Sequence, residues 1–160
     1  MKRLVLVSVI LMCLSSLLFA AEPVDNRVIS LLNSLGFNYD IDSENDFRLL
    51  MDLGDGRSQE IFINSATNTS RGQEIREVWS IAIVYDDSIP QEAAQRVLLD
   101  SYDKIIGSWY AIQNGESYYL AFCAKIPADA SSTYMNSAIL AVARGADSME
   151  SELADGVDTY

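Results

Sequence analysis

The chain has 160 residues, of which 23 are acidic and 11 are basic, and it contains no histidine. Its net charge of −12 at neutral pH argues against nucleic acids and anionic lipid surfaces as partners, because both would be repelled. Without histidine, the chain lacks the Ser/His/Asp and Cys/His arrangements of nucleophilic enzymes, and also zinc sites that use imidazole. The composition favours a soluble protein that binds a partner, with a basic partner best suited to the charge.

The N-terminal segment has the three parts of a secretory signal peptide. Lys2 and Arg3 form a basic head, residues 4–19 are almost wholly apolar, and the small residues Ala20 and Ala21 follow. An apolar run of about 16 residues is shorter than the roughly 20 that a membrane-spanning helix needs. We therefore expect cleavage after Ala20, with residues 1–20 as the signal peptide and no stable membrane insertion afterwards.

Two alternatives for this segment are weaker. An uncleaved anchor would call for a longer apolar run and a basic stop after it. Lipidation of Cys13 would call for a small residue at the preceding position, where Met12 stands, and apolar residues continue well past Cys13. The mature chain, residues 21–160, is accordingly predicted to be periplasmic or secreted.

Cleavage changes both the charge and the cysteine content. Loss of Lys2 and Arg3 leaves nine basic residues against 23 acidic ones, a net charge of −14. Cys13 leaves with the signal peptide, so Cys123 remains as a lone thiol and no disulfide forms within the chain. No neighbouring base or helix start would lower the pKa of Cys123, so we expect it to be packed rather than reactive. The mature chain has the length of one ordinary domain.

The first predicted element is a helix over residues 24–35. Its apolar side chains recur at spacings of three and four, which places them on one helical face. Asp25 falls in the first turn, where the helix dipole favours a carboxylate. Gly36 follows the last apolar residue, at the position of a C-terminal glycine cap.

Three strands follow. Residues 47–53 alternate between apolar and other side chains, and a second alternating segment covers residues 58–65 after the turn signal at residues 54–56. Residues 64–72 are polar and predict a loop. The third strand is expected over residues 74–85. Its faces are expected to carry Ile75, Trp79, Ile81 and Ile83 on one side and Val78, Ala82 and Val84 on the other.

A second helix is predicted before Gly107. Ser88 is a candidate N-cap, Pro90 follows the break, and Glu92 lies in the first turn. The apolar face expected for this helix consists of Ala94, Val97, Leu98 and Ile105.

The last elements are a hairpin and a long helix. Strands over residues 108–113 and 117–126 are joined across Asn114-Gly115, a strong hairpin signal. A helix over residues 131–153 follows, with small residues that suggest close packing on a sheet. Its expected apolar stripe is Tyr134, Ala138, Ala141, Val142, Gly145, Met149 and Leu153.

The predicted order is therefore α-β-β-β-α-β-β-α. Hairpins with helices between them indicate an α+β fold, in which a mainly antiparallel sheet of about five strands packs with three helices. No repeat, linker or second domain is evident, so residues 21–160 are expected to form a single domain.

Four short segments, in this order and spacing, resemble the YbjN family of proposed bacterial sensory transduction regulators. They are residues 31–37 (LLNSLGF), 55–59 (DGRSQ), 75–80 (IREVWS) and 146–150 (ADSME), with Asp158 and Tyr160 near the end of the chain. The resemblance covers nearly the whole mature chain and implies a fold like that of type III secretion chaperones. The resemblance implies no catalytic residues, because none is established for the family. Many members of the family are cytoplasmic, so the export signal here speaks against a cytoplasmic regulatory role.

The acidic run over residues 40–46 is the best candidate for a metal site. Its carboxylates alternate as in a calcium loop, but Asn45 and Met51 stand where such a loop has glycine and a bidentate glutamate. A solvated acidic turn is the simpler interpretation. For the other carboxylates, spacing in the sequence does not place two of them at the distance that acid–base catalysis needs. We therefore predict no metal, no cofactor and no catalytic residue.

Five residues are candidates for partner binding. Arg57 and Arg76 are scarce positive charges in an acidic chain, and Arg76 lies beside Glu74 on one face of a predicted strand. A cross-strand ion pair is the simpler interpretation for Arg76, and recognition of an acidic group is the alternative. The other candidates are the strand aromatics Trp79, Trp109 and Tyr119, for which core packing is the default and a peptide-binding groove the functional alternative.

The preferred hypothesis is a non-enzymatic, exported YbjN-like module of the bacterial envelope, chaperone-like in holding a protein or peptide partner. It would use an apolar sheet face, an exposed strand edge or a dimer groove. One alternative is a structural domain that acts as a homodimer. The other, with less support, is a hydrolase that uses carboxylates or a metal.

Overall fold

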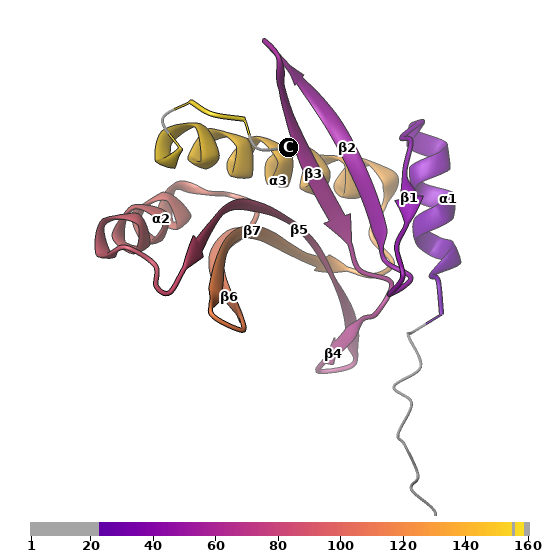
Figure 1. Ribbon diagram of the computed structural model, residues 1–160. Helices are drawn as coiled ribbons and strands as arrows, with labels where there is room; N and C mark the ends of the chain where they lie inside the picture. The colour runs from indigo at the N-terminus through magenta and orange to yellow at the C-terminus, as the bar shows by residue number, and fades with distance from the viewer. Residues whose placement is uncertain (1–22, 155, 159–160) are drawn as a thin grey trace, which may run out of the picture.

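The computed structural model describes residues 23–154 and 156–158 (Figure 1). The predicted signal peptide, Cys13 and Tyr160 lie outside these residues. No helix in the described part of the chain is long and apolar enough to cross a membrane. The elements are α1 (Asn26–Leu35), β1 (Asp40–Ile41), β2 (Phe47–Gly54), β3 (Arg57–Ile63), β4 (Asn68–Ser70), β5 (Gln73–Asp86), α2 (Gln91–Asp103), β6 (Ser108–Asn114), β7 (Ser117–Pro127) and α3 (Ser132–Leu153).

The strands form one antiparallel sheet in the order β1-β2-β3-β5-β7-β6, with β4 paired to β5. Strands β5 and β7 pair along most of their length. Strands β3 and β5 pair only where Phe62 lies opposite Trp79 and Ile63 opposite Val78, so the β2–β3 hairpin separates from β5 beyond this point (Figure 1). The predicted α+β class is confirmed. The short strands β1 and β4 are additional to the five that the alternation predicted.

The hydrophobic core lies between one face of the sheet and the helices. Helix α3 packs across β3, β5 and β7, α1 contacts α3, and α2 packs against β6. Gly145 lets α3 approach the sheet closely, because a Cβ there would lie 3.0 Å from Cδ1 of Phe122. The larger core side chains include Leu32, Phe47, Leu49, Ile61, Ile63, Val78, Phe122, Ile126, Met135, Ile139, Val142 and Met149.

The helix ends follow from capping residues. Asp25 is the N-cap of α1, and its carboxylate accepts a hydrogen bond from the Arg27 backbone N–H at 2.8 Å, so the helix begins at Asn26 rather than at residue 24. Gly36 ends α1 in the left-handed conformation (φ 74°), as predicted. Ser131 caps α3 by accepting from the Tyr134 backbone N–H.

The predicted faces of β5 are correct up to Ala82 and wrong at Ile83 and Val84. The register with β7 shifts between Ile81 and Ile83, as happens at a β-bulge. Because the extra residue reverses the alternation, Ile83 packs against the core and Val84 is exposed. The prediction assumed unbroken alternation and had placed Ile83 beside Trp79.

The predicted apolar face of α2 is correct at Val97 and wrong at Leu98 and Ile105. Ala93 and Val97 are the buried residues of this helix, whereas Leu98 and Ile105 are exposed. The N-cap position is Pro90, without a side-chain hydrogen bond, so Ser88 does not cap. The helix carries apolar residues on two faces, and only one of them meets β6.

One residue of the predicted stripe on α3 is wrong as well. Tyr134 is exposed, and its neighbour Met135 takes the buried position together with Ile139. Met135 has no polar atom that needs a partner, whereas a buried tyrosine hydroxyl does. Ala138, Val142, Gly145 and Met149 are buried as predicted.

Candidate functional site

The face of the sheet opposite the core carries an apolar surface that no described helix covers. Cross-strand pairing places Trp79 beside Phe62, Val84 beside Tyr119, and Tyr119 beside Ile112. None of its large apolar side chains belongs to the core or packs against it. We call this surface the open face, and it consists of Leu50, Phe62, Trp79, Ile81, Val84, Tyr110, Ile112 and Tyr119.

An aromatic pair stands at the centre of the open face. The rings of Phe62 and Trp79 are stacked, with centroids 4.5 Å apart and planes at 20°. The Trp79 indole Nε1 donates a hydrogen bond to Asn64 Oδ1 at 2.7 Å, which fixes the orientation of the ring. Both rings are partly exposed. A ring held in this way can contact a partner with little loss of conformational entropy.

A hollow of 300 Å³ lies at one end of the open face, lined by Glu77, Ser108, Tyr110, Cys123 and Lys125. Lys125 Nζ forms an ion pair with Glu77 Oε1 at 2.9 Å. Cys123 is buried, as predicted, and burial together with the nearby Glu77 raises the pKa of its thiol to about 12. Burial likewise raises the pKa of Tyr110. Both groups are protonated at neutral pH, so the hollow offers hydrogen-bonding groups rather than a nucleophile.

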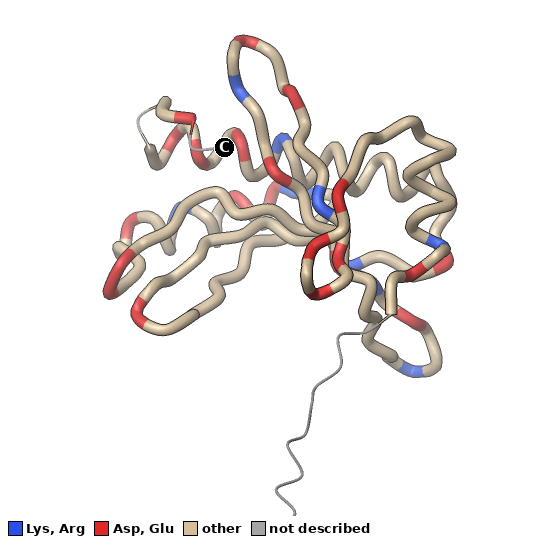
Figure 2. The backbone as a smooth tube through the Cα atoms, turned by 45° about the vertical axis from the view of Figure 1, so that its right-hand side comes forward, with Lys and Arg blue, Asp and Glu red and all other residues tan. Residues whose placement is uncertain are grey.

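The opposite end of the open face is acidic. Asp86 is the last residue of β5 and Asp87 follows it. The Asp87 backbone N–H donates to the carbonyl of Glu116 in the β6–β7 turn at 3.0 Å. Within residues 23–154 and 156–158, none of these three carboxylates forms an ion pair. Figure 2 shows acidic residues in these loops. Positive charge in a partner would be favoured here.

The predicted calcium candidate forms a backbone-bonded turn. Asp42 Oδ1 accepts hydrogen bonds from the Glu44 and Asp46 backbone N–H groups at 2.9 Å each. Asp46 Oδ1 accepts from the Ser65 N–H at 2.6 Å, and burial raises the pKa of Asp46. No group of three or more acidic or cysteine side chains in the described chain is placed to hold a metal ion. The run serves as a structural turn.

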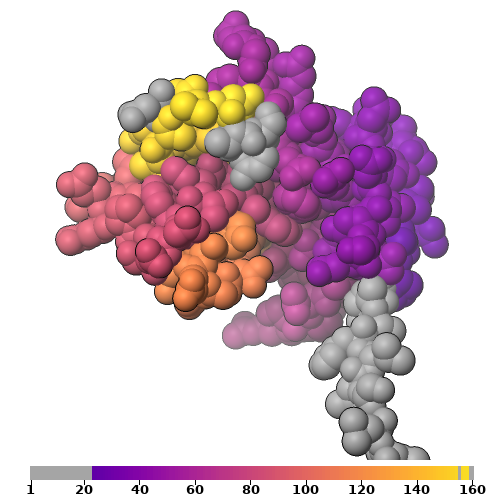
Figure 3. All heavy atoms as spheres, viewed as in Figure 1, coloured from indigo at the N-terminus to yellow at the C-terminus, as the bar shows by residue number. Residues whose placement is uncertain are grey.

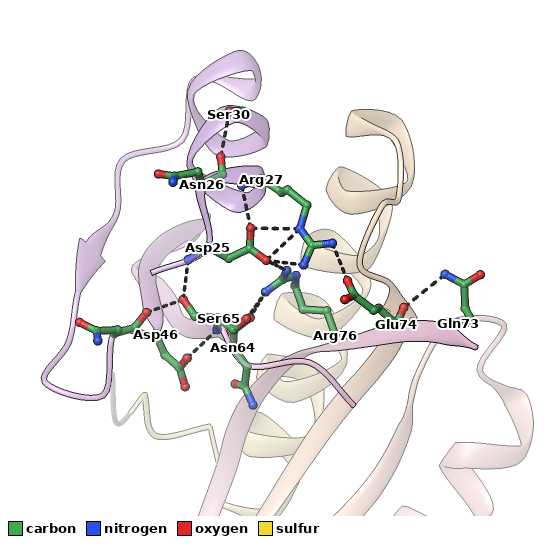
Figure 4. Close-up of polar contacts among 11 residues, drawn as sticks. Asp25, Asn26, Arg27, Ser30, Asp46, Asn64, Ser65, Gln73, Glu74 and Arg76 are labelled. Atoms are coloured by element: carbon green, nitrogen blue, oxygen red, sulfur yellow. Dashed lines mark hydrogen bonds and ion pairs between the residues drawn. The ribbon is translucent and has the colours of Figure 1, made fainter. Parts of the chain in front are cut away.

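Arg76 lies at the centre of a buried polar network (Figure 4). Its side chain is fully buried, pairs with the Asp25 carboxylate and donates to the carbonyls of Asn64 and Ser65. Burial alone would raise the pKa of Asp25, but hydrogen bonds from Arg27 and Arg76 outweigh it and lower this pKa to about 2. The network ties the start of α1 to β5 and to the loop after β3.

The cross-strand ion pair expected for Arg76 is not formed, because Arg76 pairs with Asp25 at the start of α1. Glu74 instead pairs with Arg27, whose Nη1 lies 2.6 Å from Glu74 Oε2 (Figure 4). Arg76 points to the opposite side of β5 from Trp79, because the two are three residues apart on one strand. Arg76 is therefore a structural residue here, with no surface for a partner to contact.

Arg57 and Trp109 are also engaged away from the open face. Arg57 Nε lies 2.6 Å from Asp147 Oδ1 and its Nη2 lies 3.1 Å from Glu150 Oε2, which joins the β2–β3 hairpin to α3. Trp109 is buried, packs edge-on against Phe122 and donates from Nε1 to an aspartate of α2.

Of the five predicted binding residues, the structure thus brings together only Trp79 and Tyr119. The open face also contains Phe62, Tyr110 and Ile112, which the sequence analysis did not select. The alternation of residues 58–65 places Phe62 on the side opposite Ile61 and Ile63. The whole open face could have been predicted by collecting, for every predicted strand, the apolar residues on the side that alternation places opposite the core.

No protein-family model matches the chain, and no curated protein matches it. Among solved structures, the crystal structure of YbjN from E. coli is similar in overall fold, with a TM-score of 0.45 and 8% sequence identity. The match covers 80% of this chain and 90% of that chain. Similarity at this level carries no function from one protein to the other, and membership of the YbjN family stays a prediction.

Proposed function

We propose that the mature chain, residues 21–160, is a non-enzymatic binding module that holds an extended segment of a partner protein on the open face. The observation that carries this proposal is the contiguous apolar surface centred on Phe62 and Trp79, outside the core. Isolated apolar residues are ordinary on a protein surface, whereas a contiguous patch marks an interaction site. Tryptophan and tyrosine are enriched among the residues that dominate binding energy.

The edge of the sheet supports an extended partner. Strand β6 lies at the end of the strand order and pairs with β7 alone among the described strands. A segment added along β6 would form backbone hydrogen bonds and direct alternate side chains toward Tyr110 and Ile112. The module would thereby recognise an extended shape and apolar content rather than one fixed sequence.

The charge of the site supports a basic partner. Asp86, Asp87 and Glu116 border the open face without cationic partners in the described chain, while the cations nearest its other end, Arg48 and Lys125, are already paired with glutamates. A segment that combines apolar residues with lysine or arginine would satisfy both features. Such an attraction weakens as salt increases.

Export is part of the same proposal. The basic, apolar and small-residue parts of residues 1–21 support delivery to the periplasm or the cell exterior. The mass of the protein accumulated after expression of the full coding sequence tests this. A product that begins at Ala21 is expected, and a product that retains the N-terminal segment would overturn the export part of the proposal.

Replacing Tyr119 with alanine is expected to weaken peptide binding about tenfold, because it removes an aromatic ring from the open face. The probe is a fluorescein-labelled peptide of alternating phenylalanine and lysine, and fluorescence polarisation gives its Kd. Tyr134→Ala is the matched control, since Tyr134 is exposed on α3. This variant should bind the peptide as the unmodified protein does.

Two results would contradict the proposal. One is equal Kd values for the Tyr119→Ala and Tyr134→Ala variants, which would place the binding site elsewhere. The other is the absence of binding by the unmodified protein at about 100 µM peptide, well above the Kd of ordinary specific recognition. A second peptide, with glutamate in place of lysine, measures the contribution of charge and should bind less tightly.

A further inference from the structure

Helix α2 exposes a second apolar surface that is separate from the open face. Leu98, Leu99, Tyr102 and Ile105 are exposed at 69%, 61%, 90% and 100%. Leu98 and Tyr102 are four residues apart and lie on one side of the helix, with Leu99 adjoining. Ile105 follows in the segment after the helix ends at Asp103. We call these four residues the outer face of α2. Figure 3 shows α2 at the surface of the molecule.

The outer face of α2 points away from the rest of the molecule. Ala93 and Val97 are the buried residues of the helix and belong to the same core as Trp109. Since α2 packs on the core side of the sheet, its outer face and the open face lie on different sides of the molecule. One surface can therefore be occupied while the other stays free.

The size of this surface fits an interface between proteins. Four large side chains exposed to this extent present on the order of 500 Å², in the upper half of the range of about 300–600 Å² for the largest apolar patch on a monomeric protein, which is often functional. A standard interface buries roughly 800 Å² on each partner, of which the rim is polar. Side chains around the patch would supply the remainder.

The charges beside the patch favour a second copy of the chain as the occupant. Arg96, Leu99 and Asp103 follow one another at spacings of three and four along one edge of the patch. In an antiparallel pairing about a two-fold axis near Leu99, Arg96 of each copy faces Asp103 of the other. Arg96 already pairs with Glu152 and Asp100 of its own chain, so the contact with Asp103 would add to these bonds. Asp103 forms no ion pair within the described chain, so its carboxylate is free for this contact.

We propose that the protein forms a homodimer through the outer faces of two antiparallel α2 helices. The contact is isologous, which closes the assembly at two copies. The open faces remain accessible, so the dimer presents two binding sites for extended segments. A partner that carries two such segments would then be bound with higher avidity than a single site provides.

The experiment compares the masses of purified proteins by sedimentation velocity. The full coding sequence is expressed and the accumulated product is measured from about 1 to 200 µM, a range that covers ordinary dimer affinities. The expected mass is that of two copies. Tyr102→Glu should raise the dimer dissociation constant at least 100-fold, because it places a charge in the apolar contact. Tyr134→Glu, the same change at an exposed site on α3, should leave it unchanged.

A charge exchange tests the antiparallel arrangement. Asp103→Arg should weaken the dimer severalfold by placing two arginines together. The Arg96→Glu/Asp103→Arg double variant should restore the dimer in part, because Arg96→Glu also removes the pairs of Arg96 with Glu152 and Asp100. Circular dichroism confirms that each variant folds. A monomeric mass at 200 µM, or equal dissociation constants for Tyr102→Glu and Tyr134→Glu, would overturn the proposal. Peptide binding at the open face can be measured on a monomer, so this failure is distinguishable from failure of the proposed function.

Discussion

Replacing Arg76 with methionine is expected to lower the free energy of unfolding by about 3–5 kcal/mol, the cost of breaking a buried ion pair from one side. The Arg76 side chain is fully buried and satisfies the Asp25 carboxylate and the carbonyls of Asn64 and Ser65. Methionine preserves length and apolar volume, so the loss reports on these polar contacts. The network anchors α1, and the variant should therefore loosen the helix before the rest of the fold.

Urea unfolding at neutral pH measures this loss. Arg144→Met is the matched control, because Arg144 is exposed on α3 and forms no ion pair within the described chain, so its replacement should change stability by less than about 0.5 kcal/mol. Equal unfolding midpoints for the Arg76 and Arg144 variants would contradict the structural role of Arg76.

The pH dependence of stability gives the network a second signature. The pKa of Asp25 is lowered from 3.8 to about 2 in the folded chain. A carboxylate with a lowered pKa stabilises the fold above its ordinary pKa, and this stabilisation is lost as pH falls from 3.8 towards 2. In Arg76→Met the pKa of Asp25 should return towards its ordinary value, so stability should fall less steeply over this interval than in the unmodified protein.

Replacing Arg57 with methionine is expected to cost about 2–4 kcal/mol. Arg57 places its guanidinium beside Asp147 and beside the fully buried Glu150, and it also donates to the carbonyl of Gly156. These contacts hold the tip of the β2–β3 hairpin against the end of α3. The hairpin has little backbone pairing with β5, so Arg57 is expected to be a main determinant of its position.

A double-mutant cycle with Glu150→Gln separates this ion pair from general disruption. The sum of the free energies of unfolding lost in the single variants Arg57→Met and Glu150→Gln should exceed the loss in the double variant by about 1–3 kcal/mol. This is the range for residues in one network. Arg48→Met is the control, because its ion pair with Glu60 lies at the surface and should contribute less than about 1 kcal/mol. Additive losses in the cycle would show that Arg57 and Glu150 do not stabilise each other.

Local signals in the sequence predicted the order of the main elements and the hairpins. Gly36 ended the first helix where it was expected, and the turn at residues 54–56 joined the strands on either side of it. The signal at residues 114–115 marked the second hairpin, whose turn consists of Gly115 and Glu116. These features depend on a few neighbouring residues, whose conformational preferences act over one turn. The alternation of β7 was also reliable, because no bulge interrupts it up to Ile126.

Features set by distant contacts could not be predicted. Arg76 pairs with Asp25, 51 residues earlier in the chain, and no local pattern indicates that pairing. The bulge near Ala82 reversed the faces of Ile83 and Val84, although the sequence there continues to alternate plausibly. The two apolar faces of α2 were indistinguishable in the sequence, since the choice between them depends on where β6 lies.

The residues of the open face were predicted only in part, because distant contacts also decide which strands are neighbours. Trp79 and Tyr119 were selected as aromatic residues of strands. Trp79 lies on β5 and Tyr119 on β7, and these two strands pair with each other in the sheet. Trp109 was selected on the same grounds, but it faces the core. Residue type identifies candidates for binding, whereas strand order and register decide which of them share a surface.

The most direct test of the open face uses the two tryptophans of the chain as opposed reporters. Trp79 Nε1–H lies on the open face, and Trp109 Nε1–H lies in the core, bonded to Asp100 Oδ2 at 2.8 Å. Both indole signals are followed in nitrogen-15 NMR spectra while the phenylalanine–lysine peptide is added, and a Trp79→Phe variant assigns them. The account predicts a saturable shift of the Trp79 signal with the Trp109 signal unchanged. Binding that leaves Trp79 unmoved, or that shifts both signals equally, would contradict it.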